Sequence, residues 1–89
     1  MEMDQVFLKD VPRGELLEVE TNGGIYTVEV LDPGERKLKI QGGKYFPNET
    51  EVILRTVLIK AGLKMFMYLV GSSDTVVETA KVVGVRLKL

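Results

Sequence analysis

The residues best suited to chemistry form one short group in the middle of the chain. Lys44, Tyr45 and Phe46 are consecutive, and Lys37 and Lys39 precede them in an expected strand. Basic groups beside exposed aromatic rings hold phosphates and stack bases in proteins that bind single-stranded nucleic acids. In most small domains, however, aromatic rings belong to the core and lysines are solvated. We therefore favour a structural role for this group and keep nucleic-acid binding as the alternative.

The composition argues against several kinds of catalytic site. The chain has no histidine and no cysteine, so the commonest general base, the commonest zinc ligand and the thiolate nucleophile are all missing. Ser72 and Ser73 have no histidine to activate a hydroxyl. Glu49 and Glu51 could bind a metal or transfer a proton, but two solvated acids near a turn are the simpler interpretation. We expect no enzymatic activity, no metal and no cofactor.

Two adjacent glycines, Gly42 and Gly43, interrupt the chain just before the aromatic residues. Their backbone amides could cradle a phosphate group. The spacing is not that of a G-x-G-x-x-G motif, and no strand–loop–helix pattern follows. A bend of the backbone is the better interpretation, because glycine adopts conformations that other residues avoid.

Opposite charges are segregated along the chain. Residues 1–35 hold nine acids and two bases, whereas residues 36–89 hold four acids and ten bases. A basic face could attract a polyanion. Acidic strands that pair with basic strands in one sheet would neutralise the same charges. The strand registers favour this second explanation.

Residues 15–31 predict a β-hairpin, because apolar and polar residues alternate with a period of two. Asn22-Gly23 is the preferred pair for a type I′ turn, in which both central residues have positive φ. Placing this pair in the loop avoids the like-charge contact between Glu18 and Glu29 that a Gly23-Gly24 loop would create. The predicted partners are Val19 with Tyr26 and Leu17 with Val28.

A second turn at residues 32–35 continues the hairpin into a three-stranded meander that ends near Gln41. Burial of the valines in the middle strand selects one register, with Val30 opposite Leu38 and Val28 opposite Ile40. The same register sets Glu29 opposite Lys39 and Asp32 opposite Arg36 on the outer face. Burial and charge agree on one pairing, which supports it.

The second half is more apolar. Residues 51–60 are rich in β-branched side chains, which favours a strand over the alternative helix. From residue 63 to 70 both alternating faces are largely apolar, and one small core cannot cover both. This pattern predicts a subunit interface and a homo-oligomer. The candidate interface residues are Met65, Phe66, Met67 and Tyr68.

Further short strands are expected at residues 75–79 and 82–89. Six to seven short strands in 89 residues predict a single all-β domain over residues 1–89, a small antiparallel barrel or sandwich. The pairing order beyond residue 46 stays open at this point.

The chain also resembles a family of small uncharacterised bacterial all-β proteins. The resemblance rests on the segment from Gly42 to Pro47, on Thr50-Glu51 before an apolar strand, on a glycine before the strand at 62–67, and on Thr79 followed by valines. It spans roughly residues 14–85. The family pattern would place a Gly-Ser-rich loop after residue 55, where this chain continues with Arg55-Thr56-Val57-Leu58. The resemblance implies an all-β fold and no particular activity.

Taken together, these features predict a non-catalytic protein-interaction or structural module that self-associates. A small β-barrel that binds nucleic acid is the alternative. The most apolar stretch, residues 52–70, is interrupted by Arg55, Lys60 and Lys64, so no membrane span is expected. No signal peptide is recognisable in the acidic first ten residues, and we expect a cytoplasmic protein.

Overall fold

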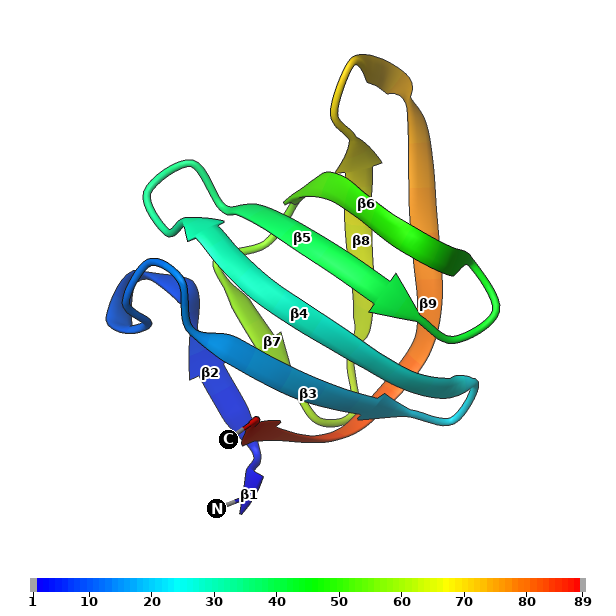
Figure 1. Ribbon diagram of the computed structural model, residues 1–89. Helices are drawn as coiled ribbons and strands as arrows, with labels where there is room; N and C mark the ends of the chain where they lie inside the picture. Colours follow the sequence, from blue (N-terminus) through cyan, green and yellow to red (C-terminus); the bar gives the residue numbers. More distant parts are fainter. Residues whose placement is uncertain (1, 89) are drawn as a thin grey trace.

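The computed structural model describes residues 2–88 and is built almost entirely of β-strands (Figure 1). In this part of the chain no helix has the length and apolar character needed to cross a bilayer. A single turn of 3-10 helix, η1 (Leu8–Asp10), follows the second strand. The strands are β1 (Glu2–Met3), β2 (Gln5–Phe7), β3 (Leu16–Thr21), β4 (Gly24–Asp32), β5 (Lys37–Gly42), β6 (Phe46–Leu54), β7 (Leu58–Lys60), β8 (Lys64–Leu69) and β9 (Ser72–Leu87).

Six strands close into an antiparallel barrel in the order β3-β4-β5-β6-β8-β9, and β9 returns to β3. The strand β9 is 16 residues long and closes the barrel by changing partner along its length. Its first part pairs with β8, and its last part pairs with β3. Figure 1 shows this long strand as the orange-to-red ribbon that runs down the right side and curves along the bottom of the view. The prediction of a small all-β domain is confirmed.

The barrel encloses one hydrophobic core, which the alternating residues of each strand fill. The two-stranded sheet of β2 and β7 and the helix η1 cover the core at one end. The fully buried side chains from the barrel strands include Leu17, Val19, Tyr26, Val28, Val30, Leu38, Ile40, Val52, Leu54, Met65, Met67 and Val85.

The N-terminal meander has the predicted registers, with two local differences. Neither Asn22 nor Gly23 has a positive φ, so the predicted type I′ turn is wrong; Gly24 at φ 138° completes the reversal instead. A bulge after Val30 sets Asp32 opposite Lys37 and not opposite Arg36. Arg36 lies in the turn at φ 57°, and its side chain donates to the Leu54 carbonyl oxygen at 2.9 Å.

In the second half, residues 51–60 contain the end of β6 and all of β7 and no helix, so the prediction of strand over helix is confirmed. The two short C-terminal strands that the sequence predicted are one continuous strand, β9. Bulges in β9 let it bend between its two partners, and they shift the alternation so that Val82 and Val85 are buried while Val83 is exposed.

Thr79 lies at the bulge in β9 where the ladder to β8 is interrupted. Its buried hydroxyl accepts a hydrogen bond from the Met65 backbone N–H at 3.1 Å and donates to the Ala80 carbonyl oxygen at 2.8 Å. The side chain therefore replaces the main-chain partner that the bulge removes. It holds the two strands together at the bend of β9.

We predict that Thr79→Val lowers the free energy of unfolding by about 1–3 kcal/mol, because the isosteric side chain leaves the Met65 N–H without an acceptor. Thr79→Ser keeps the hydroxyl and should retain most of the stability. Urea denaturation of both variants measures the difference. Equal losses for valine and serine would show that the hydroxyl does not matter.

Candidate functional site

The predicted basic-aromatic group does not form one surface. Lys37 and Lys39 lie on β5, Lys44 and Tyr45 lie in the turn that follows, and Phe46 begins β6. Tyr45 is 47% exposed, and the Lys44 ammonium lies 5.6 Å from the centre of its ring. Phe46, in contrast, is buried and meets the ring of Tyr26 edge to face at 6.2 Å. Only Lys44 and Tyr45 remain available to a ligand at this turn.

Lys37 and Lys39 extend from the outer face of β5 and are already paired with carboxylates. The Lys37 ammonium lies 3.3 Å from Glu51, and the Lys39 ammonium lies 3.7 Å from Glu29 and 3.2 Å from Glu49. Hydrogen bonding to Glu49 is the main cause that raises the pKa of Lys39. The cross-strand pair Glu29–Lys39 is the predicted one. Of these three ion pairs, Glu29–Lys39 joins the acidic first part of the chain to the basic second part, so it accounts for part of the charge segregation.

Gly42 and Gly43 form a corner that no larger residue fits. Gly42 has φ 123°, and a Cβ atom there would lie 2.3 Å from the Ile25 carbonyl oxygen. Gly43 has φ 57°, and a Cβ atom there would lie 2.3 Å from the ring of Tyr26. Burial raises the pKa of Tyr26, and the neighbouring Tyr45 phenol adds to the effect. The glycines let the backbone pass close to a core tyrosine, which supports the structural interpretation of this stretch.

The predicted interface residues of β8 divide between two sides of the barrel wall. Met65 and Met67 point into the core and are buried, so they cannot contact a partner. Phe66 and Tyr68 lie on the opposite, outer face and are half-buried. Alternation along a strand explains the division. The outer pair is the part of the prediction that stays available for an interface.

An apolar row crosses three strands at the level of Tyr68. Tyr68 pairs with Ile53 of β6 on one side and with Val76 of β9 on the other. Val70 continues the outer face of the hairpin, and it borders a hollow of about 360 Å³ that Ile53 and Tyr68 also line. We call the surface made by Ile53, Phe66, Tyr68, Val70 and Val76 the β8 face.

Charged side chains flank the β8 face at the level of Phe66. Glu78 pairs with Phe66 across the ladder, and its carboxylate accepts a hydrogen bond from Lys64 at 2.6 Å. This hydrogen bond is the main cause that raises the pKa of Lys64. On the other side, the Arg55 backbone N–H donates to the Phe66 carbonyl oxygen at 2.8 Å. The Arg55 guanidinium lies over the Tyr68 ring, 5.4 Å from its centre.

The outer surface over β3, β4 and β5 differs from the β8 face. It carries cross-strand ion pairs, including those of Arg86 with Glu18 at 2.7 Å and with Glu20 at 3.3 Å. Hydrogen bonds to these two carboxylates raise the pKa of Arg86. Single apolar residues such as Ile25 are exposed there. Apolar residues that are cross-strand neighbours on three strands distinguish the β8 face.

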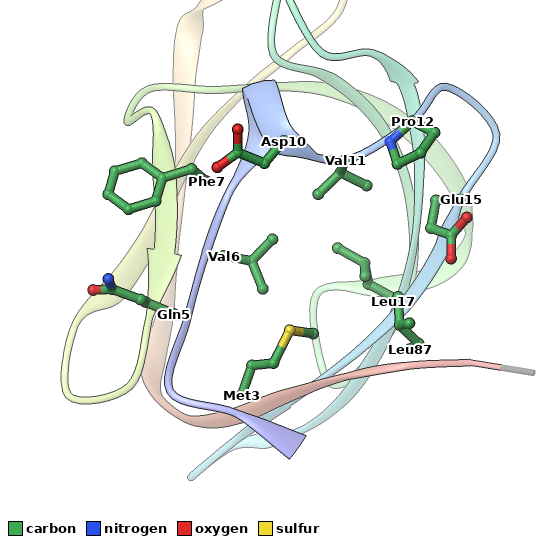
Figure 2. Close-up of a pocket in the computed structure, with 10 residues that line it drawn as sticks. All are labelled: Met3, Gln5, Val6, Phe7, Asp10, Val11, Pro12, Glu15, Leu17 and Leu87. Atoms are coloured by element: carbon green, nitrogen blue, oxygen red, sulfur yellow. The ribbon is translucent and has the colours of Figure 1, made fainter. Parts of the chain in front are cut away.

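A separate hollow of about 420 Å³ lies beside the N-terminal segment, between β2, η1 and the barrel strand β3 (Figure 2). Its floor is apolar, with Val6, Val11 and Leu17, and the carboxylates of Asp10 and Glu15 stand at its rim. The residues that line it include no hydroxyl, amine or thiol that could serve as a nucleophile. The volume lies in the range of ligand pockets, and the apolar floor with two carboxylates at its rim is suited to binding.

Comparison with protein-family models, with curated proteins and with solved structures finds nothing that matches this chain. The resemblance to small bacterial all-β proteins therefore stays a prediction. Within residues 2–88, no group of three or more acidic, histidine or cysteine side chains could hold a metal ion.

Sequence reasoning missed Ile53 and Val76, which belong to the β8 face, and the charged residues Arg55 and Glu78, which flank it. Each is unremarkable in its own segment, and only strand pairing brings it beside Phe66 or Tyr68. The sequence did show that both alternating faces of the β8 segment are apolar, which indicated a surface there. The residues beside that surface could be found only by knowing which strands pair with β8.

We predict that Gly43→Ala lowers the free energy of unfolding by about 2–5 kcal/mol, the sum of a left-handed backbone penalty and an overlap with the Tyr26 ring. Gly62→Ala is the matched control, because Gly62 also has positive φ but a Cβ atom there would meet nothing within 4 Å. That control should lose only about 1–2 kcal/mol. Thermal or urea denaturation compares the two, and similar losses would contradict the role of the corner.

Proposed function

We propose that this protein is a non-catalytic structural module that assembles with a second copy of itself through the β8 face. The contiguous apolar surface of Phe66, Tyr68, Ile53 and Val76 carries the proposal. Contiguous apolar patches of this kind mark association sites on soluble domains. This surface is where the proposal locates the self-association that the sequence predicted.

The size of the domain supports burial against another copy. A chain of 89 residues buries a smaller share of its surface than a larger domain does, so its own core contributes limited stability. The β8 face holds two aromatic side chains, Phe66 and Tyr68, that are only half-buried in the single chain. Aromatic side chains contribute large contact areas and dominate the energetics of interfaces. Self-association would remove their remaining surface from water.

The charge distribution gives less support to the nucleic-acid alternative. Of the five residues in the predicted basic-aromatic group, Lys37 and Lys39 are ion-paired and Phe46 is buried. Phosphate binding would have to compete with the carboxylates that already hold these lysines. Lys44 and Tyr45 alone offer one cation and one stacking ring.

We predict that the wild-type protein has a mass near twice the 9.9 kDa of one chain, and that Phe66→Ser/Tyr68→Ser reduces it to that of one chain. The serines remove the aromatic contacts while leaving the buried methionines in place. Light scattering behind a sizing column at several concentrations measures both masses.

The matched control is Leu16→Ser/Ile25→Ser, which removes two exposed apolar residues from the outer face of β3 and β4. It should keep the wild-type mass. A monomeric wild type at high concentration would contradict the proposal, and so would equal dissociation of the two double variants. Circular dichroism melts establish that each variant is folded.

For the alternative, we predict no salt-dependent change in the anisotropy of labelled single-stranded oligonucleotides at low salt. Weak electrostatic binding is strongest under that condition, so low salt is the most sensitive test. Binding that salt weakens and that Lys37→Glu/Lys44→Glu abolishes would instead support the nucleic-acid function.

A further inference from the structure

Arg55 is a cation in an apolar setting that lacks an anion. Its guanidinium lies on the Tyr68 ring, and within the described residues 2–88 no carboxylate forms an ion pair with it. Arg13 and Arg86, in contrast, have carboxylate partners in the same chain. A guanidinium on an aromatic ring is well suited to bind a carboxylate from a second molecule, because it is weakly hydrated and presents several donors.

The strand registers arrange the β8 face and the charged residues that flank it in two parallel rows. One row is Ile53–Tyr68–Val76, which is apolar throughout. The other row is Arg55–Phe66–Glu78, because Arg55 bonds to the Phe66 carbonyl oxygen and Glu78 pairs with Phe66. By backbone register, this second row has Arg55 at the β6 end, Phe66 in the middle and Glu78 at the β9 end. The Arg55 side chain leans toward the first row, with its guanidinium 5.4 Å from the centre of the Tyr68 ring.

A twofold axis in the plane of the face can follow either the strands or the rows, and the two resulting stacks differ in which charges meet. An axis perpendicular to β8 places the charged row of one copy on the apolar row of the other, which buries charges against apolar side chains. An axis parallel to β8 exchanges the β6 and β9 sides and keeps each row opposite itself. Arg55 then faces Glu78 of the partner subunit, and Ile53 faces Val76 of the partner subunit. Only this second arrangement is complementary in both charge and polarity.

We propose that two copies stack their β8 faces about a twofold axis parallel to β8, with Arg55 of each chain paired to Glu78 of the partner subunit. This inference rests on the proposed self-association and specifies its geometry. The interface is isologous, so the Arg55–Glu78 contact forms twice, once on each side of the twofold axis. Phe66 and Tyr68 lie on the axis and form the apolar centre.

The existing bonds of both charged groups are compatible with this pairing. Glu78 accepts one hydrogen bond from Lys64 through Oε1, and a carboxylate has further acceptor sites for a guanidinium. The contact of Arg55 with Tyr68 is a cation–π contact and supplies no hydrogen-bond acceptor, so the N–H donors of the guanidinium can bind Glu78 of the partner subunit. The ion pairs would flank the aromatic centre, and like charges at these positions would oppose association.

The test uses two single variants, Arg55→Glu and Glu78→Arg, alone and mixed. In the proposed dimer, Arg55→Glu opposes two pairs of carboxylates, and Glu78→Arg opposes two pairs of guanidinium groups. Each variant alone should raise the dissociation constant of the dimer by at least about tenfold. A one-to-one mixture brings opposite charges together at both ends, so it should form a heterodimer with close to wild-type affinity.

Light scattering and sedimentation of the separate and mixed samples measure these masses. Recovery in the mixture tests an intermolecular contact, because changes within one chain, such as loss of the Lys64–Glu78 bond, cannot be repaired by adding another chain. Melts of each single variant verify folding. Arg13→Glu is the control with the same charge change at an ion pair with Asp32, and it should keep the wild-type mass.

A mixture that stays monomeric, or a variant that dimerises as well alone as wild type, would overturn the axis and the ion pair. The proposed function fails separately, when Phe66→Ser/Tyr68→Ser leaves the wild-type mass unchanged or when the wild type is a monomer. If the aromatic double variant is monomeric but the mixture of the two charge variants does not dimerise, the proposed self-association stands and the proposed axis and ion pair are rejected.

Discussion

Closure of the barrel by one long strand is the constraint on which the rest of the structure depends. The strand β9 must satisfy β8 with its first part and β3 with its last part, so it has to bend between them. The bulges in β9 permit the bend, and the buried hydroxyl of Thr79 supplies the hydrogen bonds that the bulged backbone does not make. Because β9 also flanks β8 opposite β6, the same closure brings Ile53, Tyr68 and Val76 into one row.

The surface of the barrel follows from how the closed sheet distributes charge. Strands rich in acids lie beside strands rich in bases, so the outer faces of β3 to β6 and the end of β9 carry cross-strand ion pairs. Pairing of this kind contributes little stability for each exposed pair, but it holds Lys37, Lys39 and Arg86 against carboxylates on these strands. The β8 face stands apart because Phe66 and Tyr68 replace charged residues at its centre. The contrast between these surfaces directs the functional proposal toward assembly.

The glycine corner shows how a candidate site can prove to be structural. Gly42-Gly43 and the aromatic residues after it have the composition of a phosphate or base-binding loop, and the sequence allows both interpretations. In the fold, Gly43 packs against the ring of Tyr26, and Phe46 covers the same ring from another direction. The two glycines are needed because the core tyrosine lies where a Cβ atom would be. Of the basic-aromatic group, Phe46 is buried and Lys37 and Lys39 are ion-paired at the surface, so Lys44 and Tyr45 are the members still available to a ligand.

The sequence by itself determined the features that depend on neighbouring residues. Alternation and turn residues were sufficient for the all-β class and for the meander, including the opposition of Glu29 to Lys39, since hairpin partners are close in the chain. Local pattern was insufficient for the turn at Asn22, where Gly24 takes the positive φ, and for Asp32, where a bulge shifts the partner. Only the tertiary structure decided that β9 is continuous, that Met65 and Met67 are core, and that Arg55 and Glu78 frame one face. These outcomes depend on contacts between distant segments, and the sequence pattern of one strand carries no information about which distant strand lies beside it.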